Sequence, residues 1–436
     1  MNRQSELLKN IDWLSIFLYT LLVFMGWLNI YAAVYDESHS NILDIDLKYG
    51  KQLLWIGAAF VLGIFILLTD SKFFTAFSFV IYGLTIGLLA AVLVFGVESH
   101  GARSWFEIGG IRIQPAEFGK FATCLAIANV MSRHGFKIMR FSSLALIGLL
   151  LAIPAGLIVL QNDTGSALVY SSFILVMYRE GLHGSLLLLC FIAIAIFIFT
   201  LIYPPIVVLS LIIAGTLIAF LYYRQNKQEF YRIIIFLVSC FLFLLFLKWL
   251  FEFNIGNERL LLYAYLSTGL IGIYFIYKRK MKHILLVLLA SWVCIGATVG
   301  VDYAFEKLQP HQKDRINNLL GIETDLTGAG YNVCTVGEEW GFVGSAILIG
   351  LLMAFILRII YLAERQRSDF SRIYGYGVAS ILFFHVAINI GMTIGMAPVI
   401  GIPLPFFSYG GSSLWAFTIL IFIFLRLDAN RLQVFS

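Results

Sequence analysis

The chain has 436 residues, of which 60% are hydrophobic and 13% are charged, and its mean hydropathy is +0.90. These values exclude a soluble protein built around one apolar core and indicate an integral membrane protein. The formal net charge of +5 does not indicate a nucleic-acid partner, because the basic residues fall in short loops between apolar segments, where they set orientation.

Apolar segments of roughly membrane-spanning length follow one another along the whole chain. The first follows the sequence MNRQSELLKNIDW without a small-residue cleavage site, so we expect it to be retained as a helix. The sequence therefore predicts an all-α polytopic membrane protein with about 14 transmembrane helices, near residues 12–35, 50–69, 73–97, 115–132, 141–160, 165–178, 184–202, 204–223, 231–251, 260–277, 283–305, 338–361, 371–397 and 412–427.

The distribution of basic residues gives the orientation of these helices. Of the 30 Lys and Arg residues, 20 lie on one side of the predicted membrane, nine lie on the other, and Lys120 lies within a segment. The positive-inside rule therefore predicts that both termini are cytoplasmic. The longer polar loops lie on the opposite, outer face, near residues 35–49, 98–114, 306–337 and 401–413, so we expect the chemistry there.

The first polar segment on the outer face is SHGARSWFEIGGIRIQPAEFGK, residues 99–120. Gly-rich turns there hold Arg103 and Trp105, and the following helix carries Glu117 and Lys120 on one face, where each charge partly neutralises the other. These residues fit an interfacial Trp anchor, a headgroup-level Arg and a structural ion pair. An ionisable residue inside a span is also a functional candidate, and Lys120 could meet an anionic lipid phosphate.

Two further polar segments on this face carry acidic residues next to glycine. In VLQNDTGSAL, residues 159–168, Asp163 precedes Thr164 and fits either a helix N-cap or a site residue. In the loop of residues 308–333, Arg315 precedes Asp325, which lies in a Gly-rich turn and fits either a turn former or a catalytic acid.

The fourth polar segment is GIPLPFFSYGGSS, residues 401–413, which has no charged residue. Its prolines remove amide donors and disfavour helix, so we expect it either as a tight loop between spans or as a turn buried in protein or lining a wet cavity. Upstream, His385 and Asn389 lie one helical turn apart, and we expect His385 to be a hydrogen-bonded interior residue and not a catalyst. Together the four segments predict a shared cavity that opens outward and suits an anionic lipid-linked substrate.

The segments HGARSW, QPAEFGK, QNDTGSAL, TDLTGAGY, VGEEWGFVGS and GIPLPFFSYGGSS resemble, in order, the signature segments of the SEDS family, which includes RodA and FtsW. The resemblance is closest to the RodA branch. It implies a ten-helix core formed by residues 1–183 and 283–436, which include an outer catalytic loop at 306–337, while residues 184–282 add about four helices. It further implies an inverting peptidoglycan glycosyltransferase of the bacterial cytoplasmic (inner) membrane.

Such an enzyme polymerises lipid II, the undecaprenyl-pyrophosphate-linked disaccharide peptide, during cell elongation and shape maintenance. The resemblance implies that Asp325 is the general base, that Arg103 and Lys120 suit the pyrophosphate with Arg315 near by, and that Glu117 orients Lys120. The remaining predicted substrate-binding residues are Trp105, Asp163, Ser408 and Ser412. A divalent cation, Mg²⁺ or Mn²⁺, is also implied, although the sequence does not locate its site. The implied partners are a class B penicillin-binding transpeptidase and other membrane proteins of the elongation complex.

The sequence departs from the family pattern at three places. Asn162 and Leu326 stand where the family usually has Pro, and after Val333 the family has a further segment that is missing before CTVGEEWGF. Either the protein lacks this segment, which leaves a catalytically silent scaffold for a penicillin-binding protein as an alternative, or the printed sequence omits it. A flippase for lipid-linked precursors is another alternative. It would predict ionisable groups throughout the membrane interior and an inverted repeat, and the sequence has no obvious sign of either.

Overall fold

The computed structural model describes residues 10–34, 47–99, 102–185, 203–224, 226–253, 256–278, 282–307, 331–394 and 401–431, with residues 187, 188, 192, 199 and 200. Among these residues, nine helices are long and apolar enough to cross a membrane. The predicted class of a polytopic helical membrane protein is therefore confirmed. The number of 14 spans, the cytoplasmic placement of the termini and the three predicted domain ranges stay predictions.

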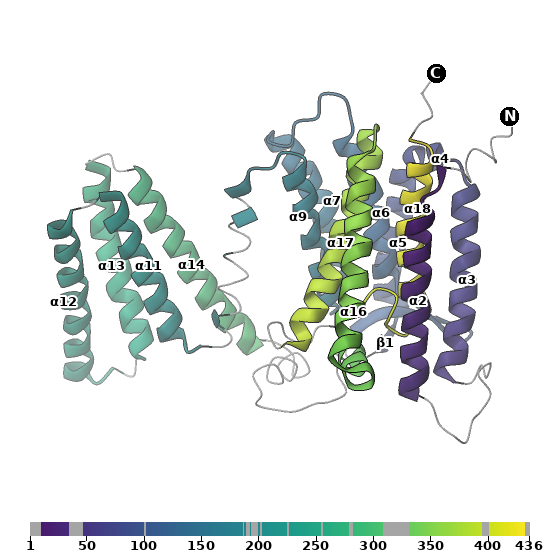
Figure 1. Ribbon diagram of the computed structural model, residues 1–436. Helices are drawn as coiled ribbons and strands as arrows, with labels where there is room; N and C mark the ends of the chain where they lie inside the picture. The colour runs from purple at the N-terminus through teal and green to yellow at the C-terminus, as the bar shows by residue number, and fades with distance from the viewer. Residues whose placement is uncertain are drawn as a thin grey trace. The chain divides into compact units, whose positions relative to one another are not determined.

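The chain forms two compact units, the first of residues 1–184 and 314–436 and the second of residues 185–313. Long apolar runs form helices because a helix satisfies its own backbone polar groups, for which lipid offers no partners. The helices of the first unit are α2 (Trp13–Val34), α3 (Lys48–Leu68), α4 (Ser71–Ala76), α5 (Ser78–Phe95), α6 (Pro115–Met131), α7 (Phe141–Leu160), α8 (Thr164–Leu168), a 3₁₀ helix (Val169–Ser172), α9 (Phe173–Arg179), α16 (Tyr331–Glu364), α17 (Asp369–Thr393) and α18 (Gly411–Ala429) (Figure 1).

Helices α6, α17 and α18 form the interior of the first unit. In α17 and α18, 72% and 83% of the most apolar window is buried, against 22% in α3, α5 and α7. Helix α17 packs against α6 and α16, and α18 packs against α3 and α6. Polar side chains on α6 and α17 therefore lie inside protein and not in lipid.

A small antiparallel sheet precedes α6, where the sequence analysis expected only turns. Its strands are β1 (Val97–Ser99), β2 (Ala102–Ile108) and β3 (Ile111–Ile113), in the order β1-β2-β3. Gly109 and Gly110, with φ of 58° and 80°, form the two-residue turn between β2 and β3, which requires positive φ at both positions. The strands were missed because they are short. The sheet lies at the end of the unit opposite to the start of α2 (Figure 1).

Three predicted spans of the first unit are not continuous helices in the part that the structure describes. The segment predicted at 73–97 is divided at Phe77 into α4 and α5. The segment predicted at 165–178 is divided into α8, the 3₁₀ helix and α9, and the Ser171 hydroxyl donates to the Leu168 carbonyl at the division. Helix α16 is interrupted at Gly341, whose φ of 64° is outside the helical region.

The second unit contains α11 (Pro205–Arg224), α12 (Lys227–Phe251), α13 (Asn257–Lys278) and α14 (Lys282–Lys307). Asn226 caps α12 by accepting from the amides of Gln228 and Glu229. Only 6% of the apolar window of α12 is buried, so this helix leaves most of its apolar surface for lipid. The core of the unit is a separate apolar cluster that includes Leu209, Ile213, Leu237, Ala264 and Leu288.

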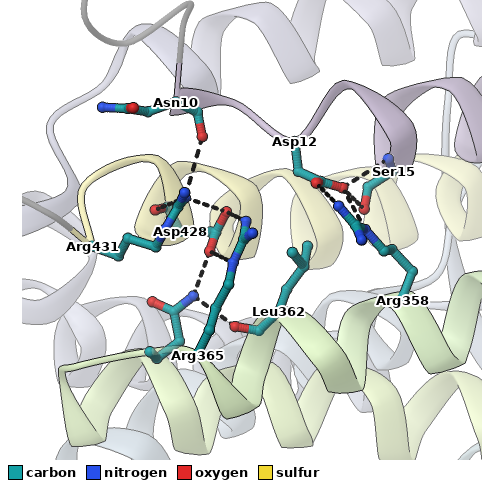
Figure 2. Close-up of polar contacts among 9 residues, drawn as sticks. Asn10, Asp12, Ser15, Arg358, Leu362, Arg365, Asp428 and Arg431 are labelled. Atoms are coloured by element: carbon teal, nitrogen blue, oxygen red, sulfur yellow. Dashed lines mark hydrogen bonds and ion pairs between the residues drawn. The ribbon is translucent and has the colours of Figure 1, made fainter.

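A network of ion pairs joins three helix ends of the first unit (Figure 2). The fully buried carboxylate of Asp428 accepts hydrogen bonds from Arg365 at 2.6 and 3.1 Å, from Gln366 at 2.6 Å and from Arg431 at 3.1 Å. Beside it, Asp12 accepts from Arg358 and from the Ser15 hydroxyl. The network therefore fastens the start of α2 and the end of α18 to the end of α16.

The environment of Asp12 shifts its pKa. Burial alone raises the pKa of this carboxyl, but the hydrogen bonds from Arg358 and Ser15 favour the charged form and together outweigh burial. The net result is a pKa below the ordinary value for Asp.

The Asp428 network gives the first prediction. Asp428→Asn removes the charge that neutralises Arg365 and Arg431, so we expect it to lower the free energy of unfolding by about 3 kcal/mol. The matched control is Glu107→Gln. Both side chains of the Glu107–Arg112 pair are exposed, so this substitution should change the free energy of unfolding by about 0.5 kcal/mol. Thermal unfolding of the purified protein in detergent compares the two variants. Equal losses in both would contradict the prediction.

The lowered pKa of Asp12 predicts a pH dependence. Because the folded carboxyl keeps its charge to lower pH than the unfolded chain, its contribution to stability is complete above the unfolded pKa and is lost as the pH falls through the folded pKa. The stability difference between the native protein and Asp12→Asn should therefore be constant above about pH 5 and shrink below about pH 4. Unfolding midpoints measured from pH 7 to pH 3 provide the test. A difference that grows on acidification would show that the sign is wrong.

Candidate functional site

A buried row of three polar side chains crosses the interior of the first unit. Pro115 opens α6 at its first position, so Glu117 and Lys120 lie on one helix face in the first turns. Lys120 Nζ donates to Glu117 Oε1 at 2.7 Å and to His385 Nε2 on α17 at 3.0 Å. The Glu117 and Lys120 side chains are 1% and 3% exposed, and His385 is fully buried. A charge this deeply buried requires a partner, and Glu117 supplies it.

The hydrogen bonds of His385 define its tautomer. A lysine ammonium only donates, so Nε2 of His385 accepts and the ring proton lies on Nδ1. From Nδ1 the ring donates to the carbonyl of Pro403 at 2.9 Å. The ring of Phe417 on α18 lies edge-on to His385, with its centroid 5.3 Å from Lys120 Nζ. His385 therefore links the buried charge on α6 to the segment that precedes α18.

Residues 401–410, which precede α18, form non-helical backbone that is mostly buried between residues 402 and 407, and several of its polar groups have partners. Asn389 donates to the carbonyl of Ile402 at 3.3 Å, and the Ser408 hydroxyl accepts from the amide of Leu404 at 2.8 Å. The amide of Gly410 donates to the side chain of Gln52 on α3 at 3.3 Å. Of the alternatives that the sequence left open, a turn buried in protein therefore fits residues 402–407, and buried backbone of this kind needs partners within the protein.

The same segment lies against α2 through a close backbone contact. A Cβ atom on Gly26 would approach the carbonyl oxygen of Phe406 to 2.2 Å, far inside contact distance. Phe406 has a φ of 70°, which a bulky residue rarely adopts. Gly26 is therefore the residue that lets α2 approach this strained turn.

A second polar junction joins α6 to the turn between α7 and α8. Gln114 donates to Asp163 Oδ2 at 2.6 Å, while Asp163 Oδ1 accepts from the amide of Ser166 at 3.0 Å and so caps α8. The amide of Arg103 on β2 donates to the carbonyl of Gln161 at 3.0 Å. Asp163 therefore acts as an N-cap, as one of its two interpretations predicted, and also binds a residue of the first polar segment.

The structure places seven of the nine predicted site residues, while Asp325 and Arg315 lie outside the described residues. Glu117 and Lys120 belong to the buried row, Asp163 to the junction with Gln114, and Ser408 and Ser412 to the turn before α18 and the first turn of α18. Arg103 is exposed and Trp105 partly exposed on β2. Helix α6 thus joins three of the four predicted polar segments. The remaining segment, residues 308–333, lies mostly outside the described residues.

Sequence reasoning missed the long-range partners of this site. The bond between Lys120 and His385 joins residues 265 positions apart, and the bond between Gly410 and Gln52 joins residues 358 positions apart. The available signal was the presence of Gln52, His385 and Asn389 in otherwise apolar segments, because buried polar groups require partners. Which partner each one has depends on packing between helices, which the sequence pattern does not specify.

The described part of the site does not fit a metal ion. Within the described residues, no group of three or more His, Cys, Asp or Glu side chains could hold one. Glu117 Oε2 has no hydrogen-bond partner among the described side chains, but the void beside Glu117 and Lys120 has no room for a water molecule. A hydrated divalent cation would not enter this void.

Comparison with known proteins places this architecture in a family. The sequence model of a family described as "Cell cycle protein", which covers FtsW, RodA and SpoVE, matches residues 12–212 and 333–433, more than half of the chain. The chain therefore belongs to the FtsW/RodA/SpoVE family, as the resemblance predicted, and it is a multi-pass protein of the bacterial cytoplasmic membrane. Residues 213–332, which include Asp325, lie outside the match.

Individual relatives match almost the whole chain. The peptidoglycan glycosyltransferase RodA of Treponema pallidum is 27% identical over 470 residues, covering 97% of this chain and 99% of the relative. The peptidoglycan glycosyltransferase MrdB of Escherichia coli is 27% identical, covering 91% of this chain and 89% of the relative. The probable peptidoglycan glycosyltransferase FtsW of Nitrosomonas europaea is 25% identical, covering 95% of this chain and 92% of the relative.

Solved structures share the fold. The crystal structure of the rod shape determining protein RodA of Thermus thermophilus superposes with a TM-score of 0.59 at 24% identity, covering 97% of this chain and 98% of that one. A chain from a structure titled for polymerization and crosslinking by a peptidoglycan synthase complex gives a TM-score of 0.60 at 24% identity, covering 97% and 99%.

The buried row gives a prediction on stability. Glu117→Ala leaves the ammonium of Lys120 buried beside His385, so we expect a loss of about 3–5 kcal/mol in the free energy of unfolding. The double variant Glu117→Leu/Lys120→Met replaces both charges by apolar groups and should recover most of that loss. A remaining loss of about 1 kcal/mol is expected because Nε2 of His385 no longer has a hydrogen-bond partner. Unfolding midpoints in detergent test both variants. A double variant as unstable as the single one would contradict this account of the pair.

Proposed function

We propose that this protein is an inverting peptidoglycan glycosyltransferase that polymerises lipid II into glycan strands at the outer face of the cytoplasmic membrane, for cell elongation and shape. The observation that carries the proposal is the family match over both halves of the first unit, together with relatives of that activity along nearly the whole chain. The elongation role rests on the RodA of Treponema pallidum and on the resemblance of the 308–333 segment to that branch.

In this proposal Asp325 is the general base. It takes the proton from the 4-hydroxyl of the acceptor sugar as that oxygen attacks the anomeric carbon of the lipid-linked donor, and the pyrophosphate leaves from the opposite side with inversion. A positioned base contributes typically about 10²- to 10⁴-fold to the rate, so orientation and stabilisation of the leaving pyrophosphate supply the rest.

The basic residues divide into two groups by their surroundings. The guanidinium of Arg103 is exposed on β2, where an anionic substrate can reach it, and Arg315 is assigned the same task by its place in the outer loop. Lys120 is buried, and its ammonium already donates to Glu117 and His385. We therefore propose that Lys120 positions the wall of the site through His385 and residues 401–413, and that direct phosphate contact requires one of these bonds to open.

The remaining predicted residues bind the substrate or shape its site. Trp105 offers a partly exposed ring on β2 for the disaccharide or for the headgroup region. Asp163 holds the α7–α8 turn beside β2, and Ser408 holds the turn before α18 by accepting from the Leu404 amide. Ser412 is buried in the first turn of α18. A divalent cation stays part of the proposal through the family resemblance alone, and we derive no step through it.

The proposed protein partner is a class B penicillin-binding transpeptidase within an elongation complex. A structurally similar chain comes from a structure titled for a peptidoglycan synthase complex that coordinates polymerization and crosslinking. Coupling to a transpeptidase suits an enzyme whose product is an uncrosslinked glycan strand.

One observation keeps a non-catalytic scaffold as a second candidate. The alignment with the Treponema pallidum relative extends over 470 residues, more than the 436 of this chain, so the relative has residues without a counterpart here. The family match also resumes only at residue 333, next to the point where the sequence lacks a family segment. A scaffold would still bind the transpeptidase but would form no glycan.

The test is polymerisation of labelled lipid II by the purified protein, with and without a transpeptidase partner. We expect glycan ladders from the native chain and at least a roughly 100-fold loss of rate in Asp325→Ala, because a positioned base contributes that much or more. The matched control is Glu107→Ala, an exposed carboxylate on β2 outside the proposed machinery, which should leave the rate unchanged.

Two outcomes would overturn the proposal. Ladders that persist in Asp325→Ala would remove Asp325 as the base. No ladders from the native chain, with intact binding of the transpeptidase, would support the scaffold.

A further inference from the structure

A cavity of about 580 Å³ lies at the ends of three helices of the first unit. It is lined by the loop that follows α6, by Glu180 and Gly181 after α9, and by Asp369, Arg372 and Ile373 at the start of α17. These ends belong to the same face as the network of Figure 2, because Arg179 at the end of α9 pairs with Glu364 at 2.9 Å, next to Arg365. This face carries the predicted cytoplasmic loops.

The walls of the cavity have a defined backbone. After α6, the amide of Phe136 donates to the carbonyl of Arg133 at 3.0 Å, and the amide of Arg140 donates to the carbonyl of Lys137 at 3.1 Å. Gly135 and Gly181 have φ of 74° and 102°, which side chains with a Cβ atom rarely adopt. Two tight turns therefore shape the cavity.

The cavity is lined by more positive than negative side chains. Both carboxylates, Glu180 and Asp369, pair with the guanidinium of Arg372 at 3.0 Å. Arg133 and Lys137 add two further cations with exposed side chains, and His134 lines the cavity beside them. With three cations and two paired carboxylates, the cavity favours an anion.

We propose that this cavity binds the phosphate of an anionic phospholipid headgroup, with Lys137 and Arg133 as its ligands. The volume is within the range of small-ligand sites, and basic pockets between transmembrane helices on the cytoplasmic side suit such headgroups. The positive-inside rule alone accounts for basic loops but not for cations around a cavity. Ile138 and Met139 add an apolar part to the lining, which suits the glycerol and the start of an acyl chain.

A bound headgroup would contact both α6 and α17 and so stabilise their packing. The cavity lies between the end of α6 and the start of α17, and these helices carry Glu117, Lys120 and His385 further along. Binding to the folded state alone raises the unfolding midpoint, so stability is a readout that does not depend on enzymatic activity.

The experiment uses the purified full chain in detergent with added phosphatidylglycerol, phosphatidylcholine or inorganic phosphate, followed by native mass spectrometry and thermal unfolding. We expect phosphatidylglycerol to bind and to raise the midpoint more than the other two. Lys137→Gln should weaken this binding about five-fold, and Arg133→Gln/Lys137→Gln should weaken it further. Lys137→Arg should retain it. The matched control is Arg140→Gln, which removes a cation from the same loop but outside the cavity lining.

Several outcomes would overturn the proposal. Equal binding of phosphatidylcholine would show that charge is not recognised, and an equal loss in Arg140→Gln would show diffuse attraction to the basic face. Equal stabilisation by inorganic phosphate would assign the cavity to a soluble phosphate compound. The side chains of Arg133 and Lys137 are exposed, so lipid-free midpoints equal to that of the native chain establish that the variants fold.

Discussion

The structure depends on one constraint, which is that charges and backbone polar groups inside the helical core must find partners within the protein. The ammonium of Lys120 is the sharpest case, because its side chain is 3% exposed and lies between Glu117 and His385. An unpaired charge there would cost several kcal/mol, and Glu117 on the same helix supplies the opposite charge. The hydrogen bond from Lys120 to His385 joins α6 to α17. His385 extends this connection to a third segment, because its Nδ1 donates to the carbonyl of Pro403. The geometry of residues 401–413 therefore depends on a charge on another helix.

The two faces of the first unit use polar groups in different ways. On the face of the helix ends in Figure 2, the ion pairs of Asp12 and Asp428 involve partly exposed arginines and fasten helices together. Near the sheet, Gln114 and Asp163 join α6 to the α7–α8 turn and leave Arg103 exposed on β2. The first arrangement stabilises the bundle, whereas the second includes an exposed guanidinium that makes only a long bond, of 3.5 Å, to the Leu93 carbonyl. This division fits the proposed function, in which Arg103 is a ligand of the lipid-linked pyrophosphate.

The sequence predicted the helices well because each apolar run is long enough to require a helix in lipid, and α7 was predicted at its observed bounds. It also predicted that residues 401–413 interrupt the helices, because two prolines exclude a regular helix, but it left open whether they form a tight loop, a turn buried in protein or the lining of a wet cavity. The division of the predicted span at 165–178 and the strands of 97–113 were missed, because they depend on short-range hydrogen bonds that apolar length does not report. The contact of Lys120 with His385 was beyond sequence reasoning, because nothing in either local segment specifies the packing of α6 on α17. Asp325 and Arg315 rest on resemblance alone.

His385 accepts from the buried ammonium of Lys120 and donates to the carbonyl of Pro403, and these two bonds connect α6, α17 and the turn before α18. Nitrogen NMR of the protein labelled with ¹⁵N-histidine tests this connection most directly, because the shifts of the two ring nitrogens report which one carries the proton. We expect a neutral ring with its proton on Nδ1, and a change of the Nε2 resonance in Glu117→Leu/Lys120→Met. A ring protonated on Nε2, or on both nitrogens, would contradict the proposed connection between α6, α17 and the turn before α18.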